Sequence, residues 1–201
     1  MRRMASLIPP VVPPGRMSAV PQPTFELNGT VRLRPWRERD APALVEAARQ
    51  DDIRHWNRPS YVTLDDARDR VEAYRQAWTA ERSAIWAIVR GSGDEERAVG
   101  LVGLGDFDLK GGSAEILYWL LPEGRGGGLA VKATVRVSRW ALDDLGLHRL
   151  RITHSTANPA SCQVATRAGV ALEGTMRSAL LHADGWHDEH LHARVRGDRW
   201  P

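Results

Sequence analysis

The order of apolar and polar positions predicts a strand–loop–helix–strand unit in the middle of this chain. Residues 114–121 are apolar on both faces except at Glu115, as in a central strand that is covered on both sides. Residues 131–145 repeat apolar positions at helical spacing, and Gly146 suits the end of that helix. Residues 148–153 then predict the second strand of the crossover.

The same pattern predicts further elements on both sides of this unit. Periodicity and capping residues predict helices over 40–49, 63–80 and 160–168. Strands are predicted over 30–34, 84–89, 98–104, 170–176 and 187–195, the last two joined by a hairpin at Asp184-Gly185. We therefore expect an α/β fold with a central mixed sheet of about seven strands and helices on both faces.

Residues 1–24 differ in composition from everything that follows. Prolines recur in this segment and interrupt its apolar residues, so it does not read as a secretory signal peptide. The composition predicts a flexible or polyproline-like tail over 1–24, in which the residues before Met17 are expected to be dispensable for folding, followed by a single domain over 25–201. It leaves open whether Met1, Met4 or Met17 is the true start.

Composition and charge narrow the class of protein. The 28 basic and 25 acidic residues give a net charge of +3, and the arginines are scattered, so a nucleic-acid partner is not favoured. The single Cys162 excludes an intrachain disulfide and is typical of a reducing cytoplasm. No apolar run in the sequence is long enough to span a bilayer. We expect a cytoplasmic protein with no membrane partner.

A glycine-rich turn, E-G-R-G-G-G-L-A over residues 123–130, lies between the apolar strand and the helix. Such a turn leaves backbone N–H groups free at a helix N-terminus, where they can bind a phosphate. The chain has no Lys-Ser or Lys-Thr pair, which excludes a P-loop, and the turn does not fit the dinucleotide pattern G-x-G-x-x-G/A in either register. What it fits is [QR]-x-x-G-x-[GA], at Arg125, Gly128 and Ala130.

This turn and four other motifs together resemble the GNAT superfamily of N-acyltransferases, and within it the Rim-type ribosomal-protein alanine/serine N-terminal acetyltransferases. The resemblance covers roughly residues 26–201. Its motifs, in order, are V-R-L-R-P at 31–35, A-E-I and Y-W-L within 114–120, the Arg125–Ala130 loop, L-G-L-H-R at 145–149, and N-P-A-S at 158–161. Three positions depart from the branch, because Leu117 replaces a glycine, Gly127 replaces a lysine or arginine, and Val170 replaces an aromatic residue.

The resemblance implies a splayed sheet that admits the pantetheine arm of acetyl-CoA, which is the expected cosubstrate, with no metal. The residues it assigns to the cofactor are Trp119, Leu120, Leu121, Arg125, Gly126, Gly127, Gly128, Leu129, Ala130, Asn158 and Ser161. An oxyanion contact is expected from a backbone N–H near Leu120 or Leu121.

Two side chains are candidates for catalysis. Ser161 matches the family serine near the coenzyme sulfur, where it could donate a hydrogen bond to the departing thiolate; helix capping is the other interpretation of Asn158 and Ser161. Glu115 is the only ionisable residue of its strand and is a candidate base for the amine. A carboxylate paired with an arginine at a strand end is almost as good an interpretation. Tyr118 offers another hydroxyl, but a tyrosine in a central strand is more often part of the core.

The expected acceptor is an amine. The residues expected to bind it are Glu115 of the 114–121 strand and Trp56, Arg58 and Tyr61. The last three lie in a loop that the family places over the acceptor site. The leading function is transfer of an acetyl group to the α-amine of a protein N-terminus. The alternatives are acetylation of a small amine (an amino acid, polyamine or antibiotic) and a non-catalytic acyl-CoA-binding module.

The late histidines His182, His187, His190 and His192 suggest a metal site, and His190 and His192 share a strand face. We expect that no cysteine joins them, and the resemblance implies no metal, so no metal site is expected. Acyl length and oligomeric state, a homodimer included, stay open.

Overall fold

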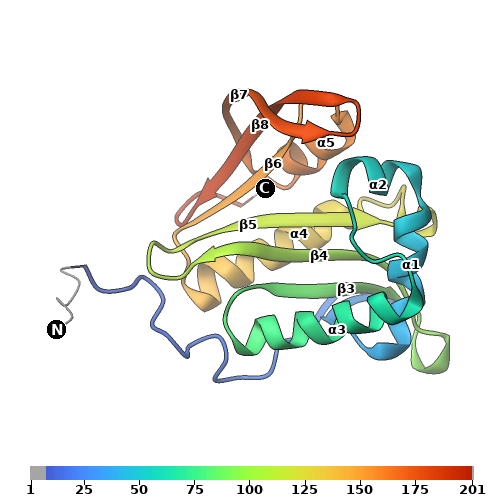
Figure 1. The fold of residues 1–201 in the computed structure, drawn as a ribbon. Helices are drawn as coiled ribbons and strands as arrows, with labels where there is room; N and C mark the ends of the chain where they lie inside the picture. Colours follow the sequence, from blue (N-terminus) through green and yellow to red (C-terminus); the bar gives the residue numbers. More distant parts are fainter. Residues whose placement is uncertain (1–7, 201) are drawn as a thin grey trace, which may run out of the picture.

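An eight-stranded mixed sheet organises the chain in the computed structural model, which describes residues 8–200 (Figure 1). The strand order is β1-β2-β3-β4-β5-β6-β8-β7, in which β5 and β6 are parallel and every other neighbouring pair is antiparallel. The expected sheet is confirmed, with β1 as the additional strand. The strands are β1 (Phe25–Asn28), β2 (Val31–Pro35), β3 (Ala84–Arg90), β4 (Arg97–Asp108), β5 (Ser113–Leu120), β6 (Arg149–Ser155), β7 (Ala171–His182) and β8 (Gly185–Val195).

The predicted helices are present, with one addition and one change of type. The additional helix is α2, and the predicted helix 131–145 divides into α4 and a π-helical segment, η4, that ends before Gly146 in the left-handed conformation. The α-helices are α1 (Ala41–Arg49), α2 (Asp51–Asn57), α3 (Leu64–Thr79), α4 (Leu129–Arg139) and α5 (Pro159–Arg167). The shorter segments are η1 (Glu38–Asp40), η2 (Gly93–Glu95), η3 (Pro122–Gly124) and η4 (Trp140–Leu145).

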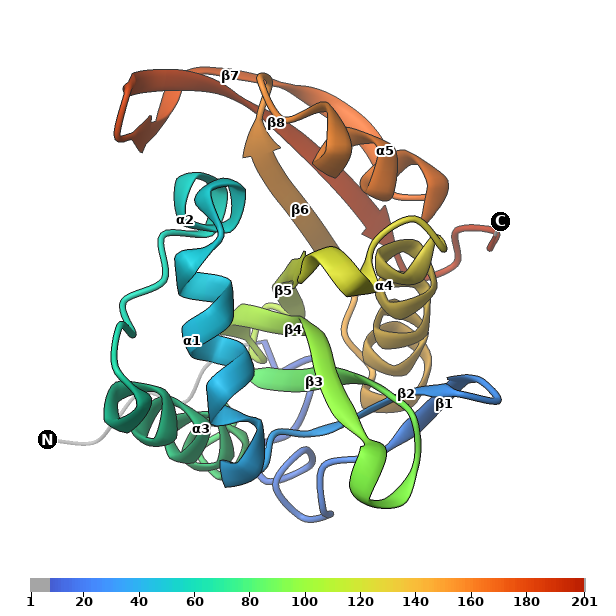
Figure 2. The same ribbon diagram turned by 90° about the vertical axis from the view of Figure 1, so that its right-hand side faces the viewer.

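The middle of the sheet is buried on both faces, and β3 shows this directly. Its residues 84–89 are all buried and alternate between two cores. Ile85, Ala87 and Val89 belong to the core with residues of α1 and α3, whereas Trp86 and Ile88 belong to the core with residues of α4 and η4. Helices α1 and α3 lie on one side of the sheet and α4 lies on the other (Figure 2). A strand covered on both faces reads as a continuous apolar run, which is why the sequence pattern identified it.

Residues 8–24 pack on the domain, so the expectation of a flexible tail is wrong for this part of the segment, whereas residues 1–7 of the predicted tail lie outside the described residues. Val12 and Met17 are each only 1% exposed and belong to the core beneath α4. The Glu81 carboxylate accepts hydrogen bonds from the backbone N–H groups of Gly15, Met17 and Ser18. Prolines prevent regular structure here, but they do not prevent apolar side chains from packing and backbone donors from finding partners.

The segment that was predicted as a loop around Trp56 is mostly helical. α2 covers residues 51–57 and ends where Arg58 adopts a positive φ of 45°. Only Ile53 is buried in this helix, so its apolar face is too narrow for the periodicity to reveal it. The correction matters for function, because a helix fixes the direction in which Trp56 points.

Candidate active site

The sheet opens between β5 and β6, and this opening creates a cleft of about 430 Å³. The two strands pair only over residues 113–115 and 149–151, after which they diverge (Figure 2). Leu121 N–H donates to the Val99 carbonyl of β4 at 2.9 Å. Because backbone directions alternate in an antiparallel ladder, the N–H groups of Tyr118 and Leu120 then point away from β4, toward the opening.

Because of this alternation, Trp119, Leu120 and Leu121, which were all expected to hold the cofactor, point in different directions. The Trp119 side chain is buried on the α1–α3 face, 6.1 Å from the Trp36 ring, and Leu121 is buried in the same core. Of the two N–H groups considered for an oxyanion, that of Leu121 is occupied by Val99 and that of Leu120 faces the opening. The backbone N–H of Leu120 is therefore the remaining candidate for the oxyanion contact.

The glycine-rich loop forms an N-terminus of α4 that no side chain caps within residues 8–200. Gly128 is the N-cap residue with a φ of 66°, and Gly126 has a φ of 89°, a region that glycine adopts without strain. A Cβ built at Gly126, Gly127 or Gly128 would meet no described atom within 4 Å. Open space beside free N–H donors at a helix N-terminus fits a pyrophosphate.

Arg125 and Ala130 connect this loop to the cleft, since both residues line it. The Arg125 guanidinium donates to the Leu120 carbonyl at 3.0 Å and pairs with Asp52 of α2 at 2.9 Å. Arg125 therefore joins the end of β5 to α2 rather than standing free. Leu129, in contrast, is buried in the core and can offer a ligand only its backbone N–H.

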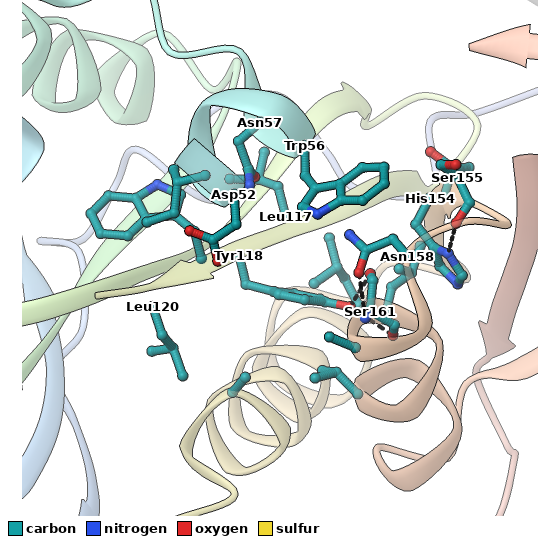
Figure 3. A pocket seen from close by; sticks show the side chains of 18 of the residues that line it. Asp52, Trp56, Asn57, Leu117, Tyr118, Leu120, His154, Ser155, Asn158 and Ser161 are labelled. Carbon is teal, nitrogen blue, oxygen red and sulfur yellow. Dashed lines mark hydrogen bonds between the residues drawn. The ribbon is translucent and has the colours of Figure 1, made fainter. Parts of the chain in front are cut away.

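Ser161, Tyr118 and Asn158 meet on the α5 side of the cleft (Figure 3). The Tyr118 hydroxyl lies 2.8 Å from Ser161 Oγ, and Asn158 Oδ1 accepts from Ser161 N–H at 3.1 Å. Burial raises the pKa of Tyr118 to about 12, although the Ser161 hydrogen bond acts in the opposite direction. Asn158 is thus the N-cap of α5, and Tyr118, which the sequence favoured as a core residue, presents a protonated hydroxyl in the cleft.

Glu115 lines the cleft but is held by protein partners. Thr153 Oγ1 donates to its carboxylate at 2.6 Å, and the Arg151 guanidinium lies 3.1 Å away. Arg151 also pairs with Asp106. This geometry matches the arginine-paired interpretation of Glu115 more closely than that of a free base.

The three residues expected around the acceptor are separated by the fold. Trp56 lines the cleft. Arg58 also lines it, but its guanidinium donates to the Leu181 carbonyl of β7 at 2.7 Å. Tyr61 is not among the lining residues, because it is 7% exposed and packs in the core with α1 and α3. The assignment of Tyr61 to acceptor binding is therefore wrong.

Glu189 of β8 is a cleft residue that sequence reasoning missed. It is 8% exposed and lines the cleft, and its carboxylate has no hydrogen-bonding partner among residues 8–200. Its position becomes visible only when β8 is placed beside β6, where Glu189 lies opposite Ser155. An unpartnered buried carboxylate in a cleft favours a cationic ligand.

Comparisons with known proteins agree with this geometry. Residues 30–171 match the family described as an acetyltransferase (GNAT) domain. The chain is 24% identical over 165 residues to the protein named "Uncharacterized N-acetyltransferase YoaA" of Bacillus subtilis strain 168, covering 82% of this chain and 92% of that protein. It is 31% identical over 101 residues to the ribosomal-protein-serine acetyltransferase of Escherichia coli strain K12, covering 50% of this chain and 56% of that one.

A solved structure shows the same fold. The structure of RimL, a ribosomal L7/L12 alpha-N-protein acetyltransferase in complex with coenzyme A, superposes with a TM-score of 0.77 at 22% identity, covering 86% of this chain and 98% of that chain. Within residues 8–200, no helix is long and apolar enough to cross a membrane. The splayed sheet, the glycine loop at α4 and the family match over residues 30–171 lead to one conclusion: the chain belongs to the GNAT family of N-acetyltransferases.

Proposed function

We propose that this protein transfers an acetyl group from acetyl-CoA to an α-amino group at a protein N-terminus. The observation that carries the proposal is the cleft between β5 and β6, which joins the uncapped N-terminus of α4 to the Tyr118–Ser161 pair. The glycine loop would hold the pyrophosphate, and the free backbone groups of β5 would hold the pantetheine arm. Acetyl-CoA supplies the activated acetyl group, and the protein positions the amine and stabilises the charges that develop.

The Tyr118–Ser161 pair is suited to hydrogen bonding with a departing thiolate. A thiol has an ordinary pKa of ~8.5, whereas the pKa of Tyr118 is raised to about 12. Full proton transfer from the phenol to the thiolate would therefore be uphill by roughly 5 kcal/mol. We assign the pair to donating hydrogen bonds, and leave protonation of the thiolate to solvent.

An α-amine suits the carboxylates of the cleft. An α-amino group titrates near ~8, so about a tenth of it is neutral at pH 7, against less than about a thousandth of a lysine side chain. Such an acceptor needs attraction and orientation more than a strong base. Glu189 is the unpartnered carboxylate of the cleft, and we assign it to binding the ammonium form, with Glu115 as a partnered neighbour.

A small amine is the second candidate acceptor, and one observation favours it. α2 and the β7–β8 hairpin touch across the acceptor side of the cleft, where a His182 ring nitrogen lies 2.9 Å from the His55 carbonyl and the two rings stack at 5.1 Å. Together with the hydrogen bond from Arg58 to the Leu181 carbonyl, these contacts narrow the entrance to the acceptor side of the cleft. A narrow entrance favours a small amine over a protein N-terminus.

The assay that tests the function is mass-spectrometric detection of acetyl transfer from acetyl-CoA. One peptide has a free N-terminus and a blocked lysine, and its counterpart has an acetylated N-terminus and a free lysine. We expect faster acetylation of the first. Faster acetylation of the second would contradict the α-amine assignment, and turnover only on amino acids, polyamines or amine antibiotics would support the second candidate.

Removing either hydroxyl of the Tyr118–Ser161 pair is expected to slow turnover. We predict that Tyr118→Phe and Ser161→Ala each lower kcat by about 10–100-fold, with little change in the acetyl-CoA KM, because the bond strengthens as sulfur gains charge. The double variant should be little slower than either single variant, since the hydroxyls act together. Tyr74→Phe, at a partly buried tyrosine outside the cleft, is the control. Full additivity of the two losses would contradict a shared role.

The two carboxylates make a matched test of acceptor binding. We predict that Glu189→Gln raises the acceptor KM by about 10-fold with an unchanged acetyl-CoA KM, because it removes a negative charge that no protein group neutralises. Glu115→Gln should change the acceptor KM less, since Arg151 and Thr153 already hold that carboxylate. Steady-state kinetics with both substrates varied separates the constants. A larger effect of Glu115→Gln would reverse the assignment.

A further inference from the structure

Three histidines and the single cysteine meet on the α5 face of the sheet, beside the cleft. His154 comes from β6, His190 and His192 come from β8, and Cys162 comes from α5. The register of the two strands explains the meeting, because His154 lies opposite His190 and Ile152 lies opposite His192. Residues two apart on a strand share a face, so all three imidazoles lie beneath α5. The expectation that no cysteine joins these histidines is wrong, because α5 brings Cys162 to them.

Hydrogen bonds fix the protonation of two of the rings. His154 Nδ1 lies 2.8 Å from the Ser155 carbonyl, and His192 Nδ1 lies 3.1 Å from the Val170 carbonyl. A carbonyl oxygen can only accept, so each Nδ1 carries the proton and each Nε2 of the neutral ring presents a lone pair. Metal-binding histidines show this pattern, in which one ring nitrogen donates to a carbonyl and the other binds the ion.

Three of the four remaining ring nitrogens are buried without partners among the described residues. His154 and His192 are 6% and 1% exposed. Within the described residues, His154 Nε2, His192 Nε2 and His190 Nδ1 have no hydrogen-bond partner. Leaving three polar atoms unpaired inside a protein is costly, so the arrangement calls for a ligand that accepts lone pairs.

We propose that His154, His190, His192 and Cys162 bind a zinc ion. One ligand atom from each residue lies within 4.8 Å of all the others. A tetrahedral zinc with bonds of about 2.0–2.3 Å needs ligand atoms about 3.3–3.7 Å apart, so side-chain shifts on the order of 1 Å would complete the site. Three imidazoles and a thiolate suit zinc better than magnesium or calcium, which prefer oxygen ligands.

Four protein ligands leave no open position, so this would be a structural and not a catalytic zinc. Its effect on the active site would be indirect. Cys162 follows Ser161 in α5, and His154 lines the cleft. The ion would therefore fasten the helix that carries Asn158 and Ser161 to β6 and β8.

The direct test is the metal content of the full chain, produced without a histidine tag in zinc-supplemented medium and dialysed. We expect about one zinc per chain by elemental mass spectrometry, and its loss in Cys162→Ser and in His192→Gln. His148→Gln, an exposed histidine elsewhere, should keep the zinc. Circular dichroism separates loss of zinc from loss of fold. If a variant does not fold, titration of the chelated wild type with zinc gives the same information.

Two further readouts do not depend on variants that delete ligands. Chelation should lower the melting temperature by about 5–10 °C, because the ion binds only the folded state. It should also expose the Cys162 thiol to alkylation, and zinc should protect it again. Folded wild-type protein without bound metal and without zinc-dependent protection would overturn the proposal in favour of a metal-free cluster. Zinc that persists in Cys162→Ser but is lost in His187→Gln would place the metal at the cleft entrance instead, and would also overturn it.

Discussion

Gly128→Val is expected to weaken coenzyme A binding by at least about 100-fold while the domain remains folded. Gly128 has a φ of 66°, which a β-branched residue adopts only with strain, so the backbone donors at the start of α4 would be redirected. The new side chain would also occupy the open space beside the loop, where we place the pyrophosphate. Calorimetric titration with coenzyme A measures the loss, and circular dichroism checks the fold.

Two matched variants separate loss of the binding site from backbone strain. Gly197 has a φ of 99° and open space around it, but it follows β8 at the end of the molecule where Arg196 contacts Leu147. Gly197→Val should therefore lower stability without changing the affinity for coenzyme A.

Gly127 has no positive φ and no described atom within 4 Å of an added Cβ. Gly127→Lys should tighten binding several-fold by adding a cation near the phosphates. An unchanged affinity in folded Gly128→Val would remove the loop from the binding site.

The sequence predicted the crossover around this loop well, and the reason is physical. β3 is covered on both faces, so it appears as an uninterrupted apolar run, and Gly128 and Gly146 mark both ends of the helical region. β5 also reads as apolar, although Leu117 is exposed in the structure. These signals are local in the chain. α2 was missed because it buries only Ile53, which leaves no periodic apolar stripe to read.

The contacts that define the site are not local, and most of them could not be predicted. Ser161 and Asn158 were found through a motif, but the hydroxyl partner of Ser161, Tyr118, comes from a strand 43 positions away. Glu189 and the histidine–cysteine cluster depend on the register between β6 and β8 and on how α5 packs over them. Alternation along a strand predicts which residues share a face. It does not predict which strand lies opposite, or with which register.

The motif V-R-L-R-P at 31–35 also makes contacts that the sequence did not predict. The motif was identified only as part of the family resemblance, yet two of its arginines belong to a buried network of ion pairs. Glu96 has a side chain with no exposed surface, and it receives hydrogen bonds from Arg32 at 2.8 Å and Arg34 at 3.0 Å. Arg39 donates to the same carboxylate at 2.6 Å, and Arg34 also pairs with buried Asp40. The motif therefore fastens β2 to the start of β4 and to α1.

Removal of the Glu96 charge is expected to be the most destabilising single change in this network. Burial alone would raise the pKa of Glu96, but the hydrogen bond from Arg32, the charge of Arg34 and the bonds from Arg34 and Arg39 lower it to about 2. Glu96→Gln would leave two or more of these guanidinium groups without their partner, at a cost of about 3–5 kcal/mol. For a domain of this size, that corresponds to a fall in Tm of roughly 6–20 °C. Glu72→Gln, at an exposed carboxylate paired with Arg75, should leave the Tm unchanged.

The same carboxylate predicts how stability depends on pH. The pKa of Glu96 is lowered from its ordinary value of 4.5 to about 2 in the folded protein, so the unfolded chain takes up this proton first as the pH falls. The stabilisation is therefore complete above pH 4.5 and is lost as the pH falls toward 2, with a total on the order of 3 kcal/mol. Urea unfolding at a series of pH values should show a steeper acid loss of stability in the wild type than in Glu96→Gln. Parallel pH profiles for the two proteins would mean that Glu96 titrates at its ordinary pKa, and that the arginines around it do not stabilise its charge.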